Sequence, residues 1–115
     1  MKLKDVETLI LSFPEVERGT SYGYPSFKVA GKFFTRIRDE DDSIVLTDIG
    51  FDERELLLEC DPQIFHLTPH YQSYPTVLAR IGKIDKKTLK AMLTRMWRRK
   101  APKKLVRVFD AEQQA

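Results

Sequence analysis

Lysine and arginine side chains, which bind phosphate groups, concentrate in the last third of the chain. Residues 80–107 carry twelve bases and one acid, a net charge of +11, whereas residues 39–61 carry ten acids and one base, a net charge of −9. Such asymmetry indicates one basic and one acidic surface. A basic surface attracts phosphate-rich partners, so the C-terminal third is the first candidate binding region.

The basic segment has the periodicity of an amphipathic helix. At 100° per residue, three cations lie away from the apolar stripe and two more follow the helix end: Lys87, Lys90, Arg98, Lys103 and Lys104. Each phosphate contact releases counterions, so binding through these side chains would be salt-sensitive and largely independent of base sequence. The alternative is that the cations of the last turn stabilise the helix C-terminus while the others are solvated.

Aromatic and basic residues interleave in a second region, around Thr20–Phe34. If exposed, its side chains could stack on bases or bind phosphate: Tyr22, Tyr24, Lys28, Lys32, Arg36 and Arg38. The favoured alternative is a β-hairpin in which Tyr22 and Phe27 fill the core and Gly31 makes the turn.

The two histidines and the single cysteine form a Cys-x5-His-x3-His pattern of Cys60, His66 and His70. Zinc sites usually have closer cysteine pairs, so the pattern is weak, and we expect Cys60 to be a half-buried core residue. His70 with Tyr71 and Tyr74 is expected to close a polar corner of the sheet or to line a shallow pocket. No nucleophile stands beside a histidine in sequence, so no catalytic residue is assigned.

The acidic run Asp39–Asp42 lacks the alternating ligands and the glycine of an EF-hand. Carboxylates of Asp52, Glu55 and Glu59 could join it to hold hard cations loosely, which is a third functional possibility. A solvated turn is the favoured interpretation, and we expect neither a metal nor a cofactor.

Hydrophobic periodicity predicts three helices and five strands. The helices are expected over 3–13, 53–61 and 86–101, and the strands over 26–30, 33–38, 43–49, 64–67 and 76–82. We expect Asp85 to cap the last helix and Pro102 to stop it. Asp52 is expected to cap the second helix, with Phe51 packed on Leu56 as a hydrophobic staple.

The register of the first hairpin is open. A two-residue loop groups Phe27 and Val29 with Phe34, whereas a three-residue loop groups them with Phe33 and Ile37.

The order helix, three strands, helix, two strands, helix predicts a single α+β domain of two layers with an antiparallel sheet of about five strands. We expect the domain to span residues 1–109 and to be followed by a disordered polar tail over 110–115. No apolar run reaches about 18 residues, and the start carries Asp5 and Glu7, so we expect a cytoplasmic protein with no membrane contact.

Three stretches of the chain resemble the MmcQ/YjbR family and occur in the same element order. They are LILSFPEVERGTSYGYPSFKVAGKFFTRI, ECDPQIFHLTPHYQSYPTVLARI and MWRRKAPKKL. The resemblance covers nearly the whole chain. It implies a compact α+β fold of the frataxin-related, double-wing kind, in a bacterial family described as probable DNA-binding proteins. It supplies no catalytic constellation.

The sequence therefore predicts a nonenzymatic protein that binds double-stranded DNA weakly through its basic C-terminal helix, assisted by the hairpin cations. The alternative is an adapter for a protein partner or small ligand, with a surface formed by Tyr22, Tyr24, His70, Tyr71 and Tyr74. A continuous positive face joining the hairpin arginines to the helix would favour DNA.

Overall fold

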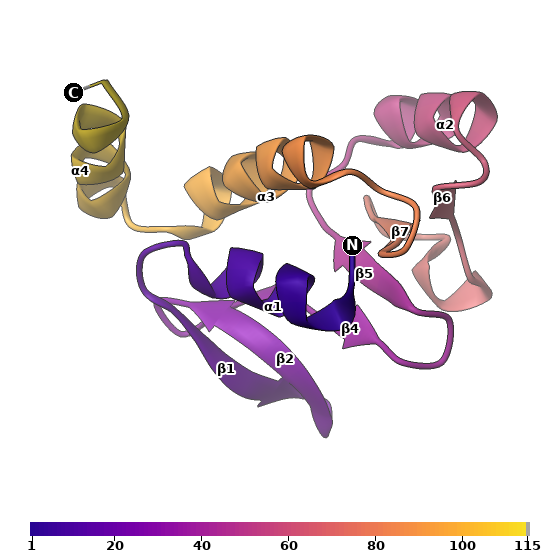
Figure 1. The fold of residues 1–115 in the computed structure, drawn as a ribbon, viewed down its shortest axis with the longest axis horizontal. Coiled ribbons are helices and arrows are strands. Elements are labelled where there is room, and N and C mark those ends of the chain that lie inside the picture. Colours follow the sequence, from indigo (N-terminus) through magenta and orange to yellow (C-terminus); the bar gives the residue numbers. More distant parts are fainter. Residues whose placement is uncertain (115) are drawn as a thin grey trace.

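The computed structural model describes residues 1–114 as one α+β domain with antiparallel sheets and four α-helices, which confirms the predicted fold class (Figure 1). The helices are α1 (Leu3–Leu11), α2 (Phe51–Cys60), α3 (Lys86–Lys100) and α4 (Lys103–Gln114), with a short 3-10 turn at Pro69–Tyr71. The strands are β1 (Val16–Ser21), β2 (Tyr24–Val29), β3 (Lys32–Thr35), β4 (Ile37–Arg38), β5 (Ser43–Leu46), β6 (Phe65–His66) and β7 (Val77–Arg80). Over the described residues, no helix is both long and apolar enough to cross a membrane.

The strands form two antiparallel sheets, ordered β1-β2-β3 and β4-β5-β7-β6. The run expected as one strand over 33–38 divides at Arg36, so that β3 belongs to the first sheet and β4 to the second. Strand β1 was not expected at all. Its side chains are mostly exposed, so it lacks the alternation of apolar residues that marks a half-buried strand.

Both hairpins of the first sheet have two-residue turns. Tyr22 and Gly23 connect β1 to β2, and Ala30 and Gly31 connect β2 to β3, all with φ between 49° and 82°. Positive φ at both turn residues is the type I′ pattern, which matches the twist of paired strands. The two-residue alternative for the β2–β3 hairpin is therefore confirmed.

The hydrophobic core lies between the sheets and the helices α1 and α3. Phe27, Val29 and Phe34 are buried in it together, as the two-residue loop requires. Helix α3 contributes the expected stripe of Leu89, Met92, Leu93, Met96 and Trp97. The indole Nε1 of Trp97 donates to the Pro14 carbonyl oxygen at 2.9 Å, which fixes α3 against the end of α1.

The helix boundaries agree with the sequence at α3 and differ at α2. The Asp85 carboxylate accepts the Thr88 amide at 3.0 Å, so the predicted cap is confirmed. Helix α2 begins two residues earlier than a cap at Asp52 would place it, with Gly50 as its N-cap, and Asp52 lies in the first turn. Phe51 and Leu56 are both exposed, so the predicted staple is wrong.

The expectation of a disordered C-terminal tail is wrong for the described residues. Pro102 does end α3, but α4 starts at once and continues through Gln114 at the opposite end of α3 from α2 (Figure 1). Three apolar residues hold it to the core, namely Leu105, Val106 and Phe109, and the Phe109 ring lies 4.7 Å from that of Trp97. The available sequence signal was the spacing of these three residues, because Val106 and Phe109 follow Leu105 by one and four positions. Pro102 before them and the polar residues 110–115 after them obscured this signal.

Candidate functional site

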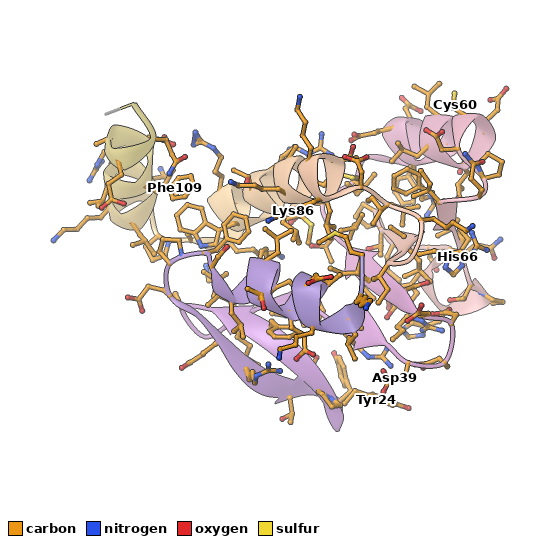
Figure 2. The ribbon with its side chains drawn as sticks, viewed as in Figure 1. Tyr24, Asp39, Cys60, His66, Lys86 and Phe109 are labelled. Carbon is orange, nitrogen blue, oxygen red and sulfur yellow. The ribbon has the colours of Figure 1, made fainter. Side chains whose placement is uncertain are left out.

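The second sheet separates the two groups of candidate cations. Ile37 and Ile44 pack into the core, on the side where α3 contacts β5. Because side chains alternate across a strand, Arg36 and Arg38 point to the opposite side, here called the outer sheet face. Figure 2 shows Tyr24 and Asp39 at the lower edge of the molecule, whereas Lys86 lies on α3 above. The hairpin arginines and the helix lysines therefore do not form one continuous positive face.

Helix α3 presents its candidate cations to solvent, where Lys87 and Lys90 are both exposed. Lys87 and Arg98 lie within about 20° of each other around the helix and about 16 Å apart along it. They share one side, as expected.

Three of the ten cations on α3 and α4 have an acidic partner within residues 1–114. Arg98 forms a two-bond ion pair with Asp110 of α4, at 2.5 and 2.9 Å. Arg95 reaches Glu53 of α2 at 2.9 Å, and Lys100 lies 3.6 Å from Asp48. The other seven have no such pair among the described residues; we call this set the helix face, although at 100° per residue Arg99 lies about 180° around α3 from Lys90. The set comprises Lys86, Lys87, Lys90, Arg99, Lys103, Lys104 and Arg107.

The two hairpin lysines lie on the first sheet. Lys28 alternates with the buried Phe27 and Val29, so it points away from the core, and its alkyl chain crosses Gly19 so closely that a Cβ there would lie 3.2 Å from Cδ. Lys32 is exposed at the start of β3. Neither joins the helix face.

The two candidate arginines of the outer sheet face are already paired. Arg36 lies 3.1 Å from Glu40 and 4.4 Å from the ring centre of Tyr24, while Arg38 lies 3.1 Å from Asp41. Both arginine side chains are only 13% exposed. The turn that was expected to be merely solvated therefore neutralises both arginines.

The charge of Asp41 depends on this pairing. Partial burial opposes its ionisation, but the hydrogen bond and the charge of Arg38 prevail and hold the pKa of the carboxyl below its ordinary value. The Asp41 carboxylate therefore stays ionised beside Arg38 at neutral pH.

Three of the candidate aromatic residues meet in the loop before β7. The His70 ring packs on Tyr71 at 4.7 Å and lies 6.1 Å from Tyr74. Arg38 lies 5.7 Å from the ring centre of Tyr71, and Arg36 lies over Tyr24, so the two arginines connect Tyr24 to this loop.

Tyr22 stands apart from this cluster. It occupies the turn of the first hairpin and is 99% exposed, so its expected place in the core is wrong. Its positive φ explains the difference, because a turn residue projects from the end of the sheet rather than onto a face.

Arg54 holds the aromatic loop in place, a role that the sequence did not reveal. It is the single base of the acidic segment, and in the structure it is buried. Its Nη1 donates to the carbonyl oxygens of Gln72 and Tyr74 at 3.1 and 2.8 Å. A lone arginine between two glutamates of an acidic helix was the only signal, and it does not identify main-chain acceptors about twenty residues away.

A serine and a histidine meet on the outer sheet face without forming a catalytic site. The Ser43 Oγ lies 2.6 Å from His66 Nε2 and donates to the Asp41 carbonyl oxygen at 3.1 Å. Burial and the charge of Arg80 lower the pKa of His66. Ser43 is 0% exposed, so its oxygen has no access to a substrate. The pair is suited to joining β5 and β6 rather than to nucleophilic attack.

The Cys-x5-His-x3-His pattern does not assemble. Cys60 is exposed at the end of α2, so its expected place in the core is wrong. His66 bonds to Ser43, whereas His70 packs on the tyrosines. In the described part of the chain, no three histidine, cysteine or carboxylate side chains lie close enough to hold a metal ion.

Comparison with known proteins agrees with the fold. The chain is 38% identical over 55 residues to "Uncharacterized protein Mb2600" of Mycobacterium bovis and, equally, to "Uncharacterized protein Rv2570" of Mycobacterium tuberculosis. The matched stretch covers 48% of this chain but only 43% of each relative. No solved structure matches the chain. The model of the YjbR family matches residues 11–99, which include both sheets and most of α3, and the chain therefore belongs to the YjbR family, which corresponds to MmcQ/YjbR.

Proposed function

We propose that this protein binds double-stranded DNA without catalysing a reaction, and that it does so through the helix face alone. The observation that carries the proposal is the absence, within residues 1–114, of an acidic partner for seven of the ten cations on α3 and α4. A cation without an acidic partner can bind a phosphate group without first breaking an ion pair.

The proposal differs from the sequence-based expectation in excluding the hairpin arginines. Arg36 and Arg38 would have to leave Glu40 and Asp41 before they could bind phosphate, and the sheet holds them away from α3. The description of MmcQ/YjbR proteins as probable DNA-binding proteins supports the choice of ligand. The cytoplasmic location stays a prediction.

The test compares two double variants of equal charge. Lys87→Gln with Lys104→Gln removes two cations of the helix face, whereas Lys28→Gln with Lys32→Gln removes two from the hairpin. Binding of a fluorescein-labelled duplex is measured by anisotropy over a range of salt concentrations. We expect the helix variant to weaken binding about tenfold and to reduce the slope of log affinity against log salt by about 1.8, because each lost phosphate contact contributes about 0.9.

The hairpin variant should leave that slope nearly unchanged. Equal losses in the two variants would mean that general net charge, not the helix face, attracts the DNA. A native protein that does not bind the duplex would overturn the proposal.

A protein partner on the outer sheet face is the second candidate function. Tyr24 and Tyr74 are each 54% exposed beside arginines, and tyrosine and arginine are the side chains that dominate binding energy at protein interfaces. Neutralised arginines suit a protein surface better than a polyanion. A Tyr24→Ala, Tyr74→Ala variant should then lose a partner that the native protein captures from a cell extract. If both proteins capture the same set, this candidate is wrong.

A further inference from the structure

We propose that a hollow between α1 and α3 holds one phosphate group of the DNA backbone, with Lys86 and Lys90 as the residues that bind it. The inference rests on the proposed function and adds to it a particular anchoring site. Lys86 was not among the cations selected from the sequence.

The hollow has a volume of about 410 Å³ and is lined mainly by Asp5, Thr8, Leu9, Ser12, Lys86 and Lys90. Three of these residues lie in α1 and Ser12 is its C-cap; they recur at spacings of three and four, so they lie on one side of that helix. Leu9 is nearly buried and forms the floor. Binding hollows for small ligands begin at about 300 Å³, so this one has room for a phosphate with part of its sugar.

The two ammonium groups make the hollow attractive to an anion. Lys86 and Lys90 are four residues apart on α3, where like charges repel each other. Neither forms an ion pair within residues 1–114, although the Asp5 carboxylate lines the same hollow. A phosphate between the two ammonium groups removes their repulsion and accepts a charge-assisted hydrogen bond from each. This advantage distinguishes the pair from Lys103 and Lys104 of α4, which are adjacent in sequence and do not line the hollow.

Two hydroxyl groups, one carboxylate and Met1 complete the lining, and the Met1 ammonium group donates to the Ile81 carbonyl oxygen at 2.9 Å. Thr8 Oγ1 and Ser12 Oγ donate within α1, to the carbonyl oxygens of Lys4 and Leu9 at 2.9 and 2.6 Å. Such bonds add little to a helix, so either hydroxyl can rotate toward an anion. Asp5 opposes an anion, and its Oδ2 also accepts the Lys2 amide at 3.1 Å. Asp5→Asn removes the charge and keeps an oxygen for that amide.

The first experiment locates the anion. The ¹⁵N–¹H spectrum of the full chain is followed while sodium phosphate replaces sodium chloride at constant ionic strength. We expect saturable shifts at the amides of residues 5–12 and 85–90, and no comparable shifts in the hairpin at residues 28–33. Asp5→Asn should tighten this binding about threefold, because it removes a repelling charge.

The second experiment connects the hollow to DNA. Lys86→Gln with Lys90→Gln is compared with Lys103→Gln with Lys104→Gln by anisotropy with the labelled duplex. All four residues are exposed, so neither variant is expected to disturb folding, which circular dichroism checks. We expect about thirtyfold weaker binding from the first pair and about tenfold from the second, as for Lys87→Gln with Lys104→Gln, since only the first pair forms a joint site.

The outcomes separate the inference from the function. Duplex binding with equal losses in the two variants, and no phosphate shifts at α1, would overturn the hollow and leave the proposed function standing. Saturable phosphate shifts without any duplex binding would support a phosphate site in the hollow. They would overturn the proposal that the bound phosphate belongs to a DNA backbone. Failure of both measurements would overturn both proposals.

Discussion

The helix face and the outer sheet face both carry candidate cations in the sequence, yet only those of the helix face lack acidic partners among the described residues. On the outer sheet face, Arg36 and Arg38 each have an acid three or four residues later in the chain and form an ion pair with it. Between residues 86 and 109 there is no acid, so the lysines of α3 and α4 have no local partner. The planar guanidinium also stacks on tyrosine, whereas a lysine ammonium is more strongly hydrated. Local acids, rather than net charge, distinguish the two faces.

The largest effect that would sharpen this comparison is expected from Arg54→Ala. This arginine is buried and donates to the Gln72 and Tyr74 carbonyl oxygens, so its loss leaves acceptors without donors and a space behind the aromatic loop. We expect the free energy of unfolding to fall by about 2–4 kcal/mol. Urea unfolding measures the loss.

Arg99→Ala is the matched control, because Arg99 is exposed and has no acidic partner within the described residues. Its effect should stay within about 0.5 kcal/mol. If the two variants unfolded at the same urea concentration, the distinction between structural and available arginines would fail.

Asp110→Asn should leave Arg98 without its acidic partner, so that Arg98 joins the cations that are free to bind phosphate. It removes the charge that holds Arg98, so we expect duplex binding to tighten about twofold. The cost in stability should be under about 1 kcal/mol, because both partners are partly exposed. Anisotropy and urea unfolding on the same sample give both values. Weaker DNA binding would show that the position of α4 matters more than the freed charge.

The pH dependence of stability should reflect the outer sheet face. Because burial and Arg80 lower the pKa of His66, the unfolded chain binds this proton more readily. The contribution of neutral His66 to the free energy of unfolding is therefore present above its unfolded pKa of about 6.5. This contribution is lost as the pH falls through the lower pKa of the folded state. The contribution of Asp41 is lost in turn, below pH 3.8.

His66→Gln should remove the first decrease and leave the second. Unfolding by urea at a series of pH values between 7.5 and 3 measures both steps, and the first is expected to be shallow because His66 is only partly buried. An unchanged profile in the variant would assign the first decrease to another group.

The smallest effect is expected from Arg36→Gln with Arg38→Gln. Both arginines are already neutralised, so duplex binding should change less than about twofold in the same anisotropy assay. A loss equal to that of Lys87→Gln with Lys104→Gln would break the comparison, because it would show that DNA reaches both faces.

The sequence predicted the elements that have strong apolar periodicity and missed those that lack it. The stripe of α3 and its cap at Asp85 were predicted correctly, since both are local features. Strand β1 escaped because its exposed residues, such as Glu17 and Arg18, carry no alternation. Its pairing with β2 depends on the turn at Tyr22 and Gly23, which the sequence pointed to only weakly.

The candidate sites were predicted less well, because their chemistry depends on contacts between distant residues. Periodicity placed Lys87 and Arg98 on one side of α3, but it could not reveal that Asp110 neutralises Arg98. The expected path of Arg36 along one strand also hid the change of sheet at that residue. Burial of Arg54 requires main-chain acceptors that no sequence pattern identifies.

The contact between Trp97 and Phe109 gives the molecule a built-in optical reporter. Trp97 is the single tryptophan, and α4 reaches it through one aromatic ring at 4.7 Å. If α4 detaches, water gains access to the indole and its emission moves to longer wavelengths. The wavelength of that emission can therefore follow the attachment of α4 in the unlabelled protein, while the fluorescein on the duplex follows binding in the same cuvette.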